Sequence, residues 1–184
     1  GVFMKKDNKF LLKILIINTL IEFVLGTLLH FTFEWSNNNV IVGAFSSVNE
    51  STWEHLKLVF FPMLLTTIIG LLFIRKSYPN YICSRLLSIV ASISFIVIFF
   101  YTYTGIIGTN FAFLDILSFF IAVLIGEFIT FKTINNNSKC NTSLSAILLL
   151  ILLLCFILCT YFPVKIGLFK DPVTNSYGIV EKNT

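Results

Sequence analysis

The sequence predicts an all-α integral membrane protein with five transmembrane helices. Hydrophobic residues make up 57% of the 184 residues and charged residues only 12%, whereas soluble domains carry about 25% charged residues. Five stretches of the chain reach the roughly 20 mostly apolar residues that a helix needs to cross the hydrocarbon core of a bilayer. The net charge of +4 is small and scattered. The composition therefore excludes a soluble enzyme and a nucleic-acid-binding module.

The five expected spans cover residues 11–33, 53–74, 82–104, 111–131 and 144–162. Polar, Asn-rich or turn-forming segments separate them. The apolar segment 40–45 is too short to cross a membrane, so we expect it to lie at the interface or to re-enter between helices. The first span is longer than the core of a signal peptide and contains polar residues, so it is expected to be a retained helix. The chain then forms one helical membrane domain over residues 1–184.

Most lysine and arginine residues fall on one side of the predicted membrane. Nine of them precede or open the first span, flank the loop after the second span or follow the fourth span: Lys5, Lys6, Lys9, Lys13, Arg75, Lys76, Arg85, Lys132 and Lys139. The loops 34–52 and 105–110 carry none, and the C-terminal tail carries Lys165, Lys170 and Lys182. The positive-inside rule then predicts a cytoplasmic N-terminus and an outer C-terminus. Residues 163–184 become an extracytoplasmic tail that can fold back as a lid.

The four cysteines do not indicate a disulfide framework. Cys83 and Cys140 fall on the cytoplasmic side of this topology, where thiols are kept reduced. Cys155 and Cys159 lie inside the fifth span, where we expect them to act as small apolar residues of the helix rather than as metal ligands. On the third span, Ser84, Ser88 and Ser92 recur every four residues, which favours close packing against another helix.

A polar stripe follows one face of the first span. Its members recur at four-residue steps, which places them on a shared face of a helix: Asn18, Glu22, Gly26, His30 and Glu34. At 1.5 Å per residue, Glu22 lies about 16 Å from Leu11 and hence near the bilayer centre. Charged groups at that depth are costly and face the interior of a bundle. The stripe therefore faces other helices rather than lipid.

The second span opens with the polar segment Val48-Asn49-Glu50-Ser51-Thr52-Trp53-Glu54-His55-Leu56-Lys57. Ser51 followed by Glu54 has the spacing of a capping box, and acidic residues suit the N-terminus of a helix. This structural explanation does not extend to His55 and Lys57, which lie further into the membrane. Glu54 and Lys57 have the i, i+3 spacing of an ion pair.

The outer ends of the first two spans bring these side chains together, with Asp115 near the outer end of the fourth span. Two histidines and several carboxylates form a donor set for Zn²⁺ or another divalent ion. The expected metal ligands are His30, His55, Glu54 and Glu34. The expected catalytic residues, acting as acid, base or ligand, are Glu54, His55, Glu50 and His30. A metal-free ligand pocket and ion pairs that only hold helices together stay open as alternatives.

Glu22 and Glu127 lie deeper than this outer cluster. Chains of intramembrane carboxylates carry protons in many transporters, so the two glutamates are candidates for a relay with Asp115 or His30. The alternative is a protonated glutamate that forms a hydrogen bond across helices. The residues expected to line the pocket or to carry protons are Asn18, Glu22, Asn49, Lys57, Asp115 and Glu127.

Three segments resemble a family of small multi-pass membrane proteins of unknown function from Gram-positive bacteria. They are the segment 48–57, His30 before the outer loop, and the tail Asp171-Pro172-Val173-Thr174-Asn175-Ser176-Tyr177-Gly178-Ile179, where the family is expected to have Gly in place of Asn175. The resemblance implies a bacterial cytoplasmic membrane but no activity. It gives weight to the outer pocket, because all three segments lie on the outer side of the predicted topology.

Three functions compete. The first is a membrane-embedded hydrolase or transferase that acts on a lipid or a short peptide at the outer leaflet. The second is a small proton-coupled transporter that uses Glu22 and Glu127. The third is a structural or interaction protein in which the polar stripe packs helices or a homo-oligomer. All three have membrane lipid as a partner, and none involves a nucleic acid.

Overall fold

The computed structural model describes residues 8–136 and 140–179. It confirms the predicted fold class, since the described residues form helices and no named strand. Five helices are long and apolar enough to cross a membrane: α1 (Asn8–Trp35), α3 (Thr52–Phe73), α4 (Tyr81–Ile107), α5 (Ala112–Thr133) and α6 (Thr142–Tyr161). Two short elements complete the described chain, namely α2 (Val40–Gly43) and the 3-10 helix η1 (Gly167–Phe169).

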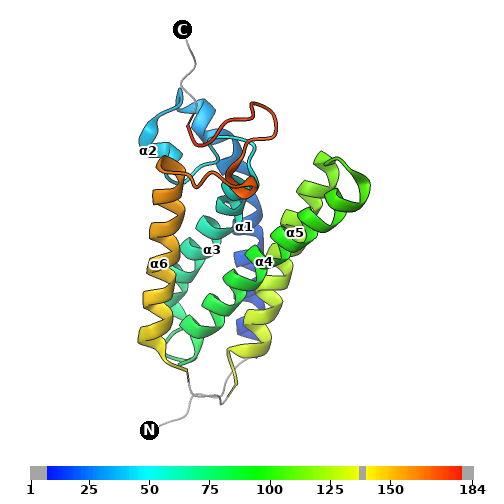
Figure 1. Cartoon of the computed structure of the whole chain (residues 1–184). Coiled ribbons are helices and arrows are strands. Elements are labelled where there is room, and N and C mark those ends of the chain that lie inside the picture. Colours follow the sequence, from blue (N-terminus) through cyan, green and yellow to red (C-terminus); the bar gives the residue numbers. More distant parts are fainter. Residues whose placement is uncertain (1–7, 137–139, 180–184) are drawn as a thin grey trace.

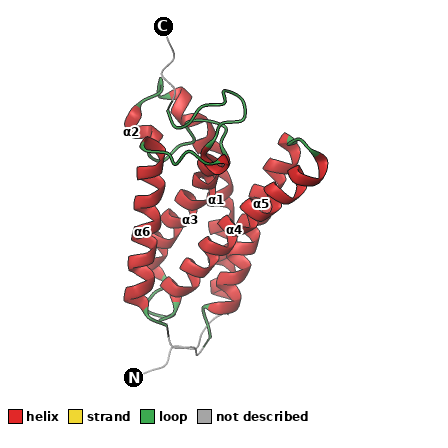
Figure 2. Cartoon of the chain, viewed as in Figure 1, coloured by secondary structure: helices red, strands yellow, loops and turns green. Residues whose placement is uncertain are grey.

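The long helices run up and down in a bundle (Figure 1). α3 packs against α1 and α4, while α5 packs against α1 and α4, and α6 packs against α4. The α4–α5 hairpin leans away from the other helices at its upper end (Figures 1 and 2). The upper end of the bundle, here called the α2 end, carries α2, residues 44–51 and residues 163–179. The opposite end carries residues 74–80 and 134–136.

The core of the bundle is built around α3. Its side chains Leu56, Val59, Phe60 and Met63 are buried and contact apolar residues of the neighbouring helices. α6, by contrast, exposes many of its aliphatic side chains, as expected for a helix whose outer face meets lipid tails. The chain is thus a multi-pass membrane protein whose apolar surface replaces the polar surface of a soluble domain.

Local sequence explains where helices begin and end. The Ser51 side chain accepts a hydrogen bond from Glu54 N at the start of α3, as the capping-box spacing predicts. Asn39 and Asn141 cap α2 and α6 in the same way. Gly108 ends α4 with a φ of 85°, a left-handed conformation that glycine adopts without steric cost.

The serine stripe of α4 packs against α5, as predicted. Ser92 Oγ donates to Ala122 O at 2.7 Å, and the hydroxyls of Ser88 and Thr130 lie 2.7 Å apart. A Cβ atom added at Gly126 would lie 2.5 Å from Ser92 Oγ. Small residues on both helices therefore allow the backbones to approach closely.

The expectation that no disulfide forms is wrong. Cys83 and Cys140 are bonded to each other, with their Cα atoms 6.2 Å apart. Cys83 lies in the first turn of α4 and Cys140 lies just before α6, and these two helices pack together. Their packing brings two cysteines together that are 57 residues apart in sequence. Cys155 and Cys159 are free thiols.

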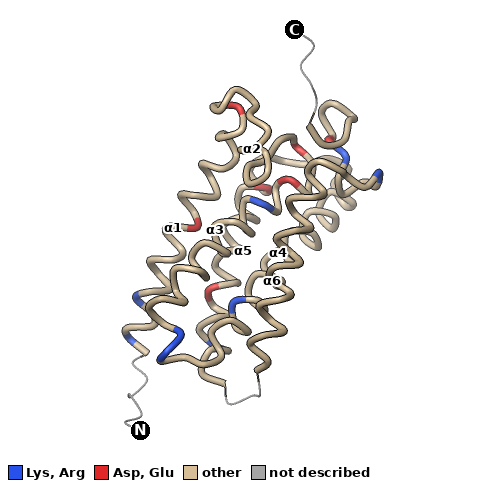
Figure 3. Tube along the Cα trace, turned by 90° about the vertical axis from the view of Figure 1, so that its left-hand side faces the viewer, with Lys and Arg blue, Asp and Glu red and all other residues tan. Residues whose placement is uncertain are grey.

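The charges are distributed unevenly along the bundle. Most acidic segments lie toward the α2 end, and basic segments lie at both ends and inside (Figure 3). The orientation with the N-terminus in the cytoplasm stays a prediction, and the Cys83–Cys140 bond counts against it, because disulfides are rare on the cytoplasmic side. Three lysines on which it rests, Lys5, Lys6 and Lys139, lie outside the described residues, and so does Lys182 of the tail, which counts against it.

Candidate functional site

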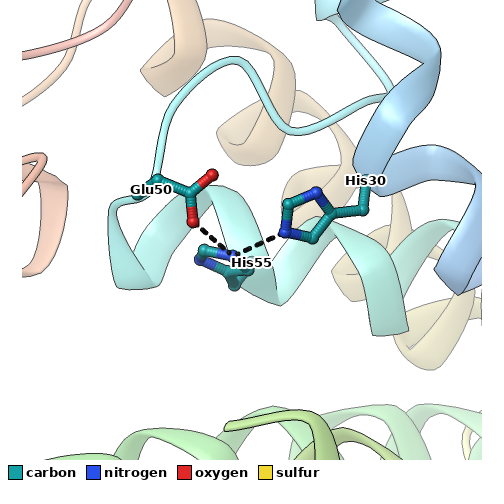
Figure 4. Close-up of side chains that lie close together, drawn as sticks. All are labelled: His30, Glu50 and His55. Atoms are coloured by element: carbon teal, nitrogen blue, oxygen red, sulfur yellow. Dashed lines mark hydrogen bonds and ion pairs between the residues drawn. The ribbon is translucent and has the colours of Figure 1, made fainter. Parts of the chain in front are cut away.

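His30, Glu50 and His55 come together at the α2 end, although they belong to three segments. His30 lies on α1, Glu50 lies in the connection between α2 and α3, and His55 lies in the first turns of α3 (Figure 4). Ser46 holds this connection against α1, because its hydroxyl accepts from Phe33 N at 3.0 Å and from Thr32 Oγ1 at 2.9 Å.

The three side chains point toward a common centre (Figure 4). His55 Nε2 lies 3.3 Å from His30 Nε2 and 3.4 Å from Glu50 Oε2. One ligand atom from each residue lies within 4.8 Å of the other two. The histidines are partly buried and Glu50 is exposed, so the cluster lies at the edge of the bundle and can be reached from outside.

A backbone carbonyl fixes the proton of His55. Ser51 O lies 3.0 Å from His55 Nδ1, and a carbonyl oxygen only accepts hydrogen bonds, so Nδ1 carries a hydrogen. In the neutral imidazole, Nε2 then presents its lone pair to His30 and Glu50. A hydrogen bond from the remote ring nitrogen to a backbone carbonyl is also the usual support for a metal-binding histidine.

Two of the three distances between the ligand atoms match the spacing around a tetrahedral metal ion. Two nitrogen ligands at 2.0–2.1 Å from Zn²⁺ lie about 3.3 Å apart when the angle between them is tetrahedral. The two contacts of His55 Nε2, at 3.3 and 3.4 Å, have this spacing. Without a metal, the same contacts fit a doubly protonated His55 that donates Nε2–H to Glu50.

Glu54, expected as a catalytic residue and a metal ligand, points into a second, buried cluster. Its Oε2 lies 2.5 Å from Lys57 Nζ and accepts from Val48 N at 3.1 Å. Thr160 of α6 donates to Glu54 Oε1 at 3.2 Å, while Lys57 also donates to Gly43 O and to Thr160. Both side chains are buried and have several polar partners. Glu54 and Lys57 thus form an ion pair, as their spacing predicts, and tie α3 to α6.

The other residues expected at the outer end supply no ligand atom to the histidine cluster. Glu34 is exposed on the last turn of α1, and its carboxylate is not among the clustered ligand atoms. Asp115 accepts hydrogen bonds from Tyr103 and Asn110 and closes the α4–α5 hairpin. Asn49 binds the tail, donating to Gly178 O at 2.9 Å.

The tail 163–179 folds back onto the start of α3. Phe169 of η1 packs on Trp53, with ring centroids 4.6 Å apart, and Trp53 stacks on Phe156 of α6 at the same distance. Within the tail, Asp171 accepts from Val173 N and from Thr174 Oγ1, which shapes the turn before Tyr177. These contacts hold the tail against the start of α3 at the α2 end. Its role as a lid stays a prediction.

Sequence reasoning missed one of the fully buried charged residues in the described part of the bundle. Arg85, counted among the residues that flank a loop, is fully buried inside α4. It forms ion pairs with Glu22 of α1, at 2.9 Å, and with Glu127 of α5. The sequence did contain an indication of this role. Two carboxylates are predicted deep in the membrane, and no other lysine or arginine is predicted at the same depth to neutralise them. Asn18, one turn before Glu22, is also buried.

A family model describes nearly the whole chain. The model of DUF6512, a family of unknown function, matches residues 4–179. The chain belongs to this family. No match was found among curated proteins or among solved structures. The family membership agrees with the predicted resemblance to an uncharacterised family.

In this DUF6512 chain, the histidine cluster, the buried Glu54–Lys57 pair and the Arg85 cluster all lie inside the matched region. Without a metal, the Nε2–H of doubly protonated His55 donates to Glu50 and holds the pKa of Glu50 below its ordinary value of 4.5, against the opposing effect of partial burial. Glu50 is thus an ionised carboxylate beside two imidazoles, a set that suits Zn²⁺ and similar divalent ions.

Proposed function

We propose that this protein binds a divalent transition metal ion, most readily Zn²⁺, through His30, Glu50 and His55 at the α2 end. The supporting observation is the position of His55 Nε2, which faces both His30 Nε2 and Glu50 Oε2 at the spacing of tetrahedral ligands. Glu50 replaces Glu54 and Glu34 in the ligand set first expected from the sequence. The carbonyl of Ser51 supports this assignment, because it directs the lone pair of His55 toward the centre.

Three protein ligands leave one coordination position for water, which is the pattern of catalytic zinc sites. Bound Zn²⁺ lowers the pKa of its water to about 7 and so supplies hydroxide at neutral pH. We therefore propose hydrolysis as the reaction: the water gives its hydroxyl group to an acyl or phosphoryl centre and its proton to the leaving group. The position of the site at the edge of an apolar bundle favours a lipid or a short membrane-bound peptide as substrate.

We place the α2 end on the outer side of a bacterial cytoplasmic membrane. The charge bias of the interhelical loops supports this orientation, because residues 34–52 and 105–110 lack lysine and arginine, whereas the tail at this end carries Lys165 and Lys170. A substrate would then come from the outer leaflet or from outside the cell.

Elemental analysis of the detergent-purified protein tests the metal proposal. After loading with Zn²⁺ and removal of free metal, the wild type should retain near-stoichiometric zinc. His30→Ala, His55→Ala and Glu50→Ala should lose it, while Glu34→Ala, on the same helix end, should retain it. If the wild type retains no metal, or if the three ligand variants retain as much as the wild type, the proposal is wrong and the cluster is a metal-free ion pair.

Hydrolysis has a separate test. The zinc-loaded protein is incubated with phospholipids and with short lipidated peptides, and the products are identified by mass spectrometry. Activity should be lost on chelation, return with Zn²⁺ and be absent in His55→Ala. A protein that retains zinc but cleaves neither substrate class would leave metal binding in place and contradict the proposed reaction.

A further inference from the structure

The buried cluster of Glu22, Arg85 and Glu127 is remote from the metal site and has no part in the proposed hydrolysis. Its three side chains come from α1, α4 and α5 and are almost completely excluded from solvent, with Glu127 at 6% and the other two at 0% exposure. α3 adds the hydroxyl groups of Thr66 and Thr67.

Arg85 is fully engaged by this environment. Its Nε donates to Thr67 Oγ1 at 2.8 Å, and its terminal nitrogens donate to Glu22, Glu127, Thr66 and Met63 O. Only one oxygen of each carboxylate takes part, since Glu22 Oε1 and Glu127 Oε1 accept these bonds. The other oxygens, Glu22 Oε2 and Glu127 Oε2, are buried and have no hydrogen-bond partner in the described part of the chain.

The cluster has one negative charge too many. Two carboxylates face one guanidinium, and among the described residues the other polar groups from the surrounding helices are uncharged: Asn18 of α1, Thr66 and Thr67 of α3, Tyr81 of α4 and Thr130 of α5. Two carboxylates that share a desolvated site do not both ionise readily, so one of them retains a proton. The proton of a carboxyl group is bound to one of its two oxygens. The two Oε2 atoms without a hydrogen-bond partner are the oxygens available to bind it.

We infer that the Glu22–Arg85–Glu127 cluster is a binding site for one exchangeable proton, which the two carboxyl groups share. With the proton bound, the cluster is neutral. Without it, a net negative charge remains inside the bundle. Glu127 is the least buried of the three side chains, at 6% exposure, although its Oε2 atom is itself buried. A deep proton site that joins three helices is the element that a proton-coupled transporter requires, and the inference stands whether or not the protein binds zinc.

Infrared spectroscopy of the purified protein in lipid tests this inference. The wild type at neutral pH should show the C=O stretch of a protonated carboxyl group, and the band should shift in D₂O while the protein stays folded. Glu22→Gln and Glu127→Gln should each fold, because the remaining carboxylate neutralises Arg85, and each should lose the band. Glu34→Gln, which changes an exposed carboxylate, should keep it.

Three results would overturn the inference. The first is a wild type without the band from mildly acidic to mildly alkaline pH. The second is a band that persists in both glutamine variants. The third is a band that never shifts in D₂O, because the proton would then not exchange. If the band is absent and Na⁺ instead stabilises the wild type but neither glutamine variant, the cluster binds a monovalent cation and not a proton.

Discussion

The Nε2 atoms of His30 and His55 lie 3.3 Å apart although the residues are 25 positions apart in the sequence. The chain between them reverses through two asparagines, Asn37 and Asn38, that both have a positive φ, and Ser46 then fastens the returning segment to α1. Two neutral nitrogens with facing lone pairs would repel each other. The contact is therefore favourable only when a proton or a metal ion lies between them.

The stabilisation that Glu50 provides should depend on pH in a defined direction. Its pKa in the folded protein is below the ordinary value of 4.5 because of the hydrogen bond from His55. A depressed carboxyl pKa stabilises the fold above about pH 4.5, and this contribution is lost as the pH falls through the folded-state pKa. Thermal unfolding of the wild type and of Glu50→Gln in detergent should therefore differ at neutral pH and converge in acid.

The matched control for this prediction repeats the Glu50→Gln comparison in a variant that lacks the His55 side chain. In a His55→Ala background, Glu50→Gln should have little effect at any pH, because residue 55 then has no side-chain donor. An equal effect of Glu50→Gln in both backgrounds would show that the carboxylate acts independently of His55.

Removing one member of the Lys57–Glu54 pair should lower the free energy of unfolding much more than replacing both members with uncharged residues. Lys57→Met leaves Glu54 buried without its counter-charge, which typically costs about 3–5 kcal/mol. The double variant Glu54→Gln/Lys57→Met carries no buried charge and should recover much of this loss. Denaturant unfolding in detergent measures both variants, and a double variant as unstable as Lys57→Met would contradict this explanation.

Gly26 should tolerate no side chain. A Cβ atom added there would lie 2.5 Å from Leu58 O of α3 and 2.5 Å from the ring of Phe119. Gly26→Ala must therefore push α1 away from α3, at a cost of about 1–3 kcal/mol. Gly105→Ala is the control, because its Cβ atom would meet nothing within 4 Å, and alanine at a helical position should leave stability equal or slightly higher. Equal unfolding midpoints for the two variants would refute this assignment.

Trp53 should control whether the tail stays on the bundle. Its ring lies between Phe156 and Phe169, so Trp53→Ala removes the surface on which η1 rests. Limited proteolysis should then cleave residues 163–179 several times faster than in the wild type. Trp35→Ala, which removes an exposed ring stacked on Phe31, should leave the cleavage rate unchanged, and equal acceleration in both variants would show that the effect is not local.

The sequence predicted the fold well because bilayer length and hydropathy dictate it. The expected span 53–74 corresponds to α3 at Thr52–Phe73, and the other four spans agree similarly. Helix periodicity also predicted that Asn18 and Glu22 turn inward. The convergence of His30 with His55 followed from placing both at one end of adjacent helices.

Side-chain partners across helices could not be obtained in this way. Glu54 and His55 are neighbours in sequence, yet about 100° separates adjacent residues around a helix, so one faces Lys57 and the other faces His30. Arg85 looked like a loop residue because it lies near a helix start, and its long side chain carries the guanidinium to Glu22 inside the bundle. The bond between Cys83 and Cys140 depends on how α4 and α6 pack, which no local pattern encodes.

The two buried charge clusters differ in how they become neutral during synthesis. Glu54 and Lys57 belong to one helix, so α3 brings both opposite charges into the bilayer at once. Glu22 is synthesised on α1, long before Arg85 on α4 can compensate it, and Glu127 follows on α5. The helices of this chain therefore do not insert into the membrane independently. α1, α4 and α5 must associate before the charge of Glu22 on α1 is accommodated in lipid.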